Sequence, residues 1–161
     1  MEKILLGIDP GSLRTGFGIV SHSSNSKVEH VTHGTIVLDA KKNLSERLSD
    51  LACDLKTLIE KYQPHYAVVE GVFFCKNARS ALVLGQARGV ALAVLGLNAI
   101  PVQELSPTQV KSLVAGRGRA QKFQVAQIVA LNLGIAVPCS EDASDALALA
   151  LACSYQSNIS F

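Results

Sequence analysis

The sequence predicts a single α/β domain built on a mixed, five-stranded sheet flanked by helices. Three observations lead to this prediction. Three strand-like segments come first, in the style of hairpins; strand-like and helical segments then alternate; and the 161 residues show no repeat or linker that would mark a second domain. Hairpins followed by β-α-β connections place antiparallel and parallel pairing in one sheet. We therefore expect residues 1–161 to form one domain with one sizeable core.

Short apolar segments bounded by turn residues predict the five strands. The first, KILLGI, stops at the turn sequence Asp9-Pro10-Gly11, and the polar stretch HSSNS suits a hairpin loop between the next two. The segment HYAVVE has the length and composition of a short buried strand. The expected strands are residues 3–8, 15–21, 27–38, 65–70 and 99–105.

Apolar residues at helical spacing predict the helices. Pro64 marks the end of the first helix, and Ser106 followed by Pro107 is typical of a capped helix start. The glycine-spaced basic stretch GRGRAQ, at 116–121, predicts a loop. The expected helices are residues 44–62, 77–96, 107–114, 121–133 and 142–155.

Composition describes a folded protein, because hydrophobic residues make up 48% of the chain and charged residues only 17%. Gln86 and Arg88 interrupt the longest apolar run, 81–97, so we expect no membrane span. The start, MEKILLGIDPG, lacks the layout of a signal peptide. The four cysteines show no metal-ligand spacing, and free thiols in a reducing cytoplasm are a plainer interpretation than disulfides.

Basic residues are concentrated in one part of the chain. Residues 76–122 carry seven lysines and arginines and one acid, Glu104, whereas the remainder carries more acids than bases. A chain divided in this way can present one face to a polyanion. The alternative is a generally solvated surface.

Two acidic residues lie where predicted strands end. Asp9 ends the first strand, and because Leu5, Gly7 and Asp9 share one face, we expect Gly7 to leave open space beside the acid. Glu70 ends the fourth strand, at the edge where ligands of open α/β sheets bind. The alternatives are that Asp9 only opens a turn and that Glu70 is solvated.

Two further acids, Asp142 and Asp145, lie at the head of an otherwise apolar helix, EDASDALALA. Residues three apart on a helix lie about 5–6 Å apart and face the same way. The helix dipole can account for Asp142, but Asp145 lies beyond the first turn among alanines and leucine. A carboxylate beside a core is costly unless it is paired or binds a cation.

Convergence of these four acids would need a cation to offset their repulsion. Carboxylates without His or Cys suit Mg²⁺ or Mn²⁺. Two such ions, about 3.5–4 Å apart, can clamp a phosphodiester, with one activating water and the other stabilising the leaving oxygen. We expect two Mg²⁺ ions at each active site, with Mn²⁺ as a substitute.

Three segments of the sequence resemble the RuvC family of Holliday-junction resolvases. They are GIDPGSLRTGFGIV, VVEGVFFCKNARSALVLGQARGVALAV and EDASDALALA, and the resemblance runs from about residue 4 to 155. It implies a ribonuclease H-like fold, a homodimer, Mg²⁺-dependent symmetric cutting of four-way DNA junctions in recombination and repair, and cooperation with the RuvAB branch-migration complex. Gly71 departs from the family pattern, in which we expect a polar residue such as Gln.

The resemblance also implies roles for individual residues. It makes Asp9, Glu70, Asp142 and Asp145 both catalytic and metal-ligating, and it makes Phe73, Lys111 and Lys122 DNA-binding. An exposed Phe73 would stack on an unpaired base, whereas packing into the core is the alternative.

The residues themselves support a phosphate contact in the same region. Lys111, Arg117, Arg119 and Lys122 flank a loop whose glycines permit close approach to phosphates, although a merely solvated loop is the alternative. Arg14 follows the Asp9-Pro10-Gly11 turn and is a further candidate for phosphate contact.

Small residues on helix 77–96 predict close packing, either against the sheet of the same subunit or, as the resemblance implies, against a second subunit. A four-way junction has approximate two-fold symmetry, so a dimer can cut opposite strands. We therefore expect a cytoplasmic, homodimeric junction endonuclease that leaves a 5′-phosphate and a 3′-hydroxyl.

Three other functions fit part of the pattern. A junction-binding protein that does not cut would keep the basic segment but not need the acids. An actin-like ATPase would share GIDPGS followed by Thr15-Gly16, but those enzymes enclose nucleotide between two such domains, and this chain is too short. A ribonuclease H-like nuclease acting on RNA would keep the acids, and the block NARSALVLGQARG argues against it.

Overall fold

The structure, a computed structural model, describes residues 2–25, 27–71 and 77–156. Its centre is a five-stranded sheet with the order β3-β2-β1-β4-β5. The first three strands pair antiparallel, and β4 and β5 extend the sheet parallel to β1. The predicted mixed sheet is therefore confirmed. The strands are β1 (Glu2–Asp9), β2 (Arg14–Ser23), β3 (Val28–Val37), β4 (Tyr66–Glu70) and β5 (Val102–Leu105).

Five helices follow the predicted order, and local capping accounts for several of their ends. Asn43 and Ser106 each accept a hydrogen bond from the backbone in a capping box, and Ser140 caps the last helix. The described helices are α1 (Leu44–Tyr62), α2 (Ala78–Leu97), α3 (Pro107–Ala115), α4 (Lys122–Leu133) and α5 (Glu141–Ser154).

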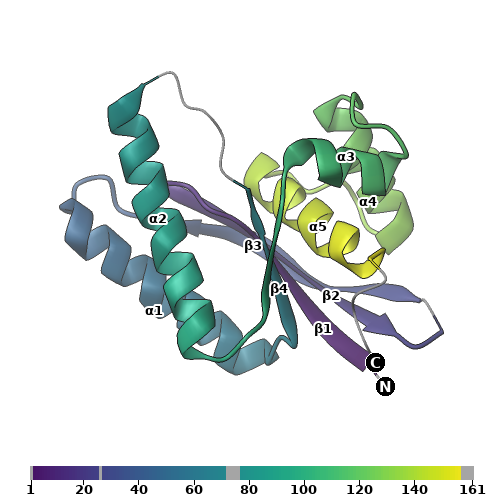
Figure 1. Cartoon of the computed structure of the whole chain (residues 1–161), viewed down its shortest axis with the longest axis horizontal. Coiled ribbons are helices and arrows are strands. Elements are labelled where there is room, and N and C mark those ends of the chain that lie inside the picture. The colour runs from purple at the N-terminus through teal and green to yellow at the C-terminus, as the bar shows by residue number, and fades with distance from the viewer. Residues whose placement is uncertain (1, 26, 72–76, 157–161) are drawn as a thin grey trace.

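The helices cover the two faces of the sheet in two groups (Figure 1). Helices α1 and α2 pack on one face around a core that includes Leu51, Leu55 and Leu95. Helices α3, α4 and α5 cover the other face around Leu147 and Leu151. Of these, α5 lies directly on the sheet, and every residue from Ala146 to Ser154 is buried.

Three glycines let α5 lie unusually close to the sheet. Added Cβ atoms would meet backbone atoms of α5 at 2.0 Å on Gly7, 1.9 Å on Gly16 and 2.6 Å on Gly18. Gly7 and Gly18 are cross-strand partners on β1 and β2, and with Gly16 they form the surface on which α5 packs, which we call the glycine seat. The prediction that Gly7 leaves open space beside Asp9 is therefore wrong, because the backbone of α5 fills that space.

Strand β5 is the element that departs most from its predicted bounds. Strand β5 begins at Val102 instead of residue 99. Ala99 has a left-handed backbone with φ of 54°. Pro101 has no N–H to donate to a sheet, and only its carbonyl pairs with β4, accepting from the N–H of Ala67 at 2.9 Å.

Candidate functional site

Four acidic side chains meet at one end of the sheet. Asp9 is the last residue of β1 and Glu70 the last of β4. The two strands are parallel neighbours with Ile8 opposite Val69, so each acid follows a paired residue at the same edge. Asp142 and Asp145 lie in the first two turns of α5, which crosses this edge on its glycine seat. The structure thus brings together all four predicted acids.

Of the four acids, Asp9 has the most strongly raised pKa. Burial, the charge of Glu70, a hydrogen bond with Glu70 and the charges of Asp145 and Asp142 together raise its pKa to about 8. Burial and then the Asp145 carboxylate raise the pKa of Glu70 as well, against the opposing effects of the Asp9 hydrogen bond and of Lys122. At neutral pH, therefore, the pair shares a proton that a bound cation would displace.

The two acids of α5 are each engaged by a cation. The Nε of Arg14 donates to Asp142 at 2.8 Å, and the Nζ of Lys122 donates to Asp145 at 2.8 Å. The side chains of both acids keep about a third of their surface exposed. These ion pairs explain how the acids are tolerated at the edge of an apolar core. The hydrogen bond from Lys122 to Asp145 also raises the pKa of the lysine.

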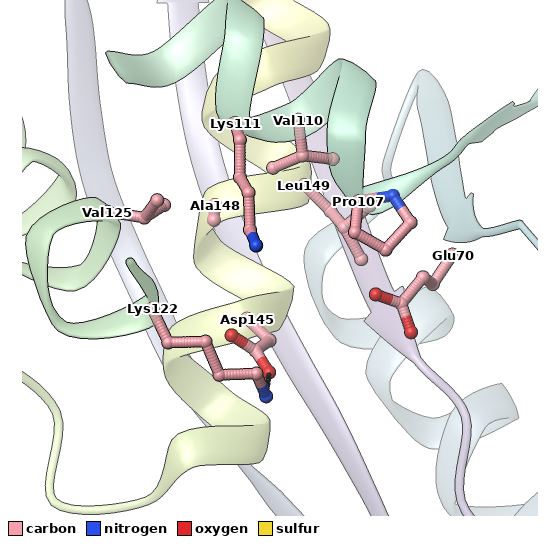
Figure 2. Close-up of a pocket in the computed structure, with 9 residues that line it drawn as sticks. All are labelled: Glu70, Pro107, Val110, Lys111, Lys122, Val125, Asp145, Ala148 and Leu149. Carbon is pink, nitrogen blue, oxygen red and sulfur yellow. Dashed lines mark hydrogen bonds and ion pairs between the residues drawn. The ribbon is translucent and has the colours of Figure 1, made fainter. Parts of the chain in front are cut away.

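A pocket of about 270 Å³ opens beside these acids (Figure 2). Glu70 reaches into it from β4, Asp145 rises from α5, and the amine of Lys111 points into it from α3. Its back wall is apolar, and is formed by Pro107, Val110, Val125, Ala148 and Leu149. A pocket lined by both carboxylates and lysines can hold a phosphodiester between metal ions and cations.

The remaining predicted DNA-binding residues lie close to this pocket along the chain. Arg117 and Arg119 are exposed in the loop between α3 and α4. That loop begins at Gly116, whose φ of 70° is left-handed, and buried Ala120 anchors it before Lys122. Phe73 falls outside the described residues.

The donor set suits a hard divalent cation, because it consists of carboxylate oxygens whose mutual repulsion already shows in the raised pKa of Asp9. Within residues 2–25, 27–71 and 77–156, no three carboxylate, imidazole or thiol groups are gathered closely enough to hold a metal ion as they stand. Two of the four acids are held instead by Arg14 and Lys122. Metal binding therefore requires these side chains to reorganise.

Comparison with known proteins identifies the family. The family model described as "Crossover junction endodeoxyribonuclease RuvC" matches residues 5–153. The chain belongs to the RuvC family. Curated RuvC proteins support this: that of Citrifermentans bemidjiense is 44% identical over 97% of this chain and 94% of its own length. That of Bdellovibrio bacteriovorus is 43% identical over 93% of this chain and 89% of its own. Divalent-metal dependence follows, in general terms, from membership of this nuclease family.

Solved structures show the same fold. Thermus thermophilus RuvC in complex with Holliday junction substrate is 28% identical to this chain, covers 95% of it and 93% of its own chain, and superposes with a TM-score of 0.90. The yeast mitochondrial Holliday junction resolvase is 20% identical, with a TM-score of 0.68 over 94% of this chain and 78% of its own. The ribonuclease H-like fold expected for this RuvC protein is confirmed.

Sequence reasoning missed several contacts that support the site. Arg14 was expected to contact phosphate, yet here it binds Asp142, a partner 128 positions away that no local pattern reveals. The Nε of Arg88, on α2, donates to the carbonyl of Glu70 at 3.3 Å and so supports the end of β4. The spacing of the glycines at 7, 16 and 18 was the available signal for a closely seated helix.

Proposed function

We propose that this RuvC-family enzyme resolves four-way DNA junctions during recombination and repair by paired symmetric nicks, using two Mg²⁺ ions that Mn²⁺ can replace. The observation that carries the proposal is the convergence of Asp9, Glu70, Asp142 and Asp145 at one end of the sheet, beside a pocket that Glu70 and Asp145 line together with Lys111 and Lys122. The complex of Thermus thermophilus RuvC with Holliday junction substrate supports junction DNA as the substrate of a close structural relative.

The four acids would hold the metal ions, which supply Lewis-acid activation of water and of the phosphodiester when bound. The protein contributes the positions of its own charges. Asp9 and Glu70 would release their shared proton to solvent when they hold a cation, because their raised pKa values reflect burial and repulsion that the cation would offset. Lys122 then exchanges Asp145 for a phosphate oxygen, and Lys111 approaches the same phosphate from α3.

We propose that Arg117 and Arg119 contact the backbone of the junction arms, since both are exposed on a loop that leads into Lys122. Phe73 is proposed to stack on an unpaired base at the junction centre, by its resemblance to the family aromatic that follows the catalytic Glu.

A homodimer through α2 fits the outward surface of that helix. Added Cβ atoms on Gly85, Gly89 and Gly96 would meet nothing within 4 Å, and Leu82 and Leu97 are largely exposed. By length and composition alone α2 also qualifies as a membrane span, although its inner face packs on α1 within the core. A second copy of α2 covering the small, apolar outer stripe accounts for this surface without a membrane.

We propose that the dimer works in the cytoplasm, with the RuvAB branch-migration complex as its partner and chromosomal junctions as its substrate. Unlike a binding protein without nuclease activity, such an enzyme requires every acid.

The test is cleavage of a labelled four-way DNA junction with Mg²⁺ by Asp9→Asn and Asp145→Asn variants, with Asp54→Asn as a control because Asp54 is exposed on α1. We expect both site variants to lose cleavage while still binding the junction in a gel shift, and the control to cut normally. Retained cutting by both site variants would refute the metal-site assignment. An RNA junction of matched sequence cut faster than the DNA junction would refute DNA as the substrate.

A further inference from the structure

A second hollow, of about 210 Å³, adjoins the catalytic pocket. The two share Lys122 and Asp145, so the second hollow begins where the proposed scissile phosphate lies. We call it the α4–α5 groove. Its lining residues are Lys122, Phe123, Ala126, Val137, Pro138, Cys139, Glu141, Ser144 and Asp145.

The apolar part of this groove is exposed to solvent. Phe123 follows Lys122 on the first turn of α4, and 63% of its surface is exposed. Val137, on the facing wall, is 47% exposed, and Pro138 and Ala126 complete an uncharged surface. An exposed aromatic ring beside other apolar groups, in a concave site, is typical of a surface that receives a flat ligand.

The charges of the groove distinguish which part of a nucleotide it accepts. Glu141 and Asp145 line it, so a phosphate placed inside would meet two carboxylates. Lys122 stands on the boundary with the catalytic pocket and favours a phosphate there. An uncharged base with its π face toward an aromatic ring is compatible with the interior, and the attached phosphate stays outside.

We propose that the α4–α5 groove binds a nucleobase next to the scissile phosphate, stacked on Phe123, and so helps to set where along the strand the cut falls. This inference rests on the proposed function, because it places the DNA strand continuously through the catalytic pocket and the groove. Because the bound strand runs on from the catalytic pocket into the groove, we expect a base of that strand to occupy the groove, and not a protein segment.

Cys139 allows occupancy of the groove to be measured directly. It is an exposed free thiol in the groove lining, whereas Cys53 is an exposed free thiol on α1, across the sheet. Alkylation of each cysteine by iodoacetamide is followed by mass spectrometry, with and without a four-way junction, in metal-free buffer with EDTA so that the junction stays uncut. We expect bound junction to slow alkylation of Cys139 at least fivefold and to leave Cys53 unchanged.

Two results of this experiment would overturn the inference. One is equal alkylation of Cys139 with and without DNA while a gel shift of the same samples shows bound junction. The other is protection of Cys139 that rises with protein concentration when no DNA is present, because a second copy of the chain would then be the occupant. A junction that does not bind at all contradicts the proposed function, and with it this inference.

Substitution of the aromatic ring tests the consequence for cutting. Because Phe123 is mostly exposed, Phe123→Ala is expected to fold, and Leu131→Ala is a matched control, since Leu131 is 82% exposed on the same helix and lines neither pocket. We expect Phe123→Ala to bind the junction about five- to tenfold more weakly and to spread its cuts over more positions of a branch-migrating junction. Phe123→Trp should restore both properties. Identical affinity and cut positions for Phe123→Ala and Leu131→Ala would overturn the inference, even where both variants still cut.

Discussion

Alanine in place of Gly18 is expected to slow junction cleavage far more than it weakens junction binding. The added Cβ would lie 2.6 Å from the backbone N of Leu147 in α5, whereas ordinary contact begins at 3.4 Å. The backbone of a buried helix cannot rotate away as a side chain can, so α5 must move outward by about 0.8 Å. Asp142 and Asp145 move with it, away from Asp9 and Glu70.

The size of the effect follows from that displacement. A misplacement of about 1 Å at a catalytic centre costs roughly 100-fold in rate, so we expect cleavage by Gly18→Ala to fall about 30- to 100-fold. Overpacking of this kind costs about 1–3 kcal/mol of the free energy of unfolding, which a domain of this size withstands. Junction affinity should change less, because exposed basic residues such as Arg117 and Arg119 can contact DNA without being aligned with Asp9 and Glu70.

The assay is single-turnover cleavage of a labelled junction at saturating enzyme, with affinity from a gel shift and folding from circular dichroism. Gly71→Ala is the matched control: it adjoins Glu70, but its Cβ would meet only ordinary contacts, the nearest at 3.4 Å. We expect the control to cut within a few-fold of the wild-type rate. A folded Gly18→Ala variant that cut as fast as Gly71→Ala would refute the reasoning that the glycine seat aligns the acids.

Three further predictions follow from the charges and surfaces of the molecule. Asp9 has a raised pKa of about 8 and must lose its proton to bind metal. The affinity for Mn²⁺, measured by titration calorimetry, should therefore rise about tenfold per pH unit up to pH 8 and then level off. The Asp9→Asn variant should not show this pH dependence. Removing Arg117 and Arg119 together should reduce the slope of log affinity against log salt by about 2 in filter binding, and an unchanged slope would exclude both phosphate contacts. Leu82→Glu should convert the proposed dimer to a folded monomer in analytical ultracentrifugation, because this exposed side chain lies on the outer stripe of α2. A persistent dimer would place the interface elsewhere.

All ten described helices and strands could be predicted from the sequence because their signals are local. Apolar periodicity, Pro64 and the Ser106-Pro107 start act within a few residues of the elements that they delimit. The positions of the four acids could also be predicted, since each lies at a strand end or a helix start.

The spacing between layers could not be predicted in the same way. Gly7 suggested empty space when its strand was considered alone, but its neighbour is a helix more than 130 positions later in the chain. The engagement of Asp142 by Arg14 and of Asp145 by Lys122 likewise depends on tertiary contacts. Such contacts decide which charges are paired before DNA or metal arrives, and no local pattern encodes them.

The central claim is that α5, seated on glycine, brings two acids to meet Asp9 and Glu70 around metal ions. Anomalous scattering from Mn²⁺ in crystals of the enzyme with a four-way junction tests it most directly. The account predicts anomalous peaks bounded by Asp9, Glu70, Asp142 and Asp145, beside a phosphate of the bound strand. Peaks at other residues, with these four carboxylates still held only by one another and by Arg14 and Lys122, would contradict it.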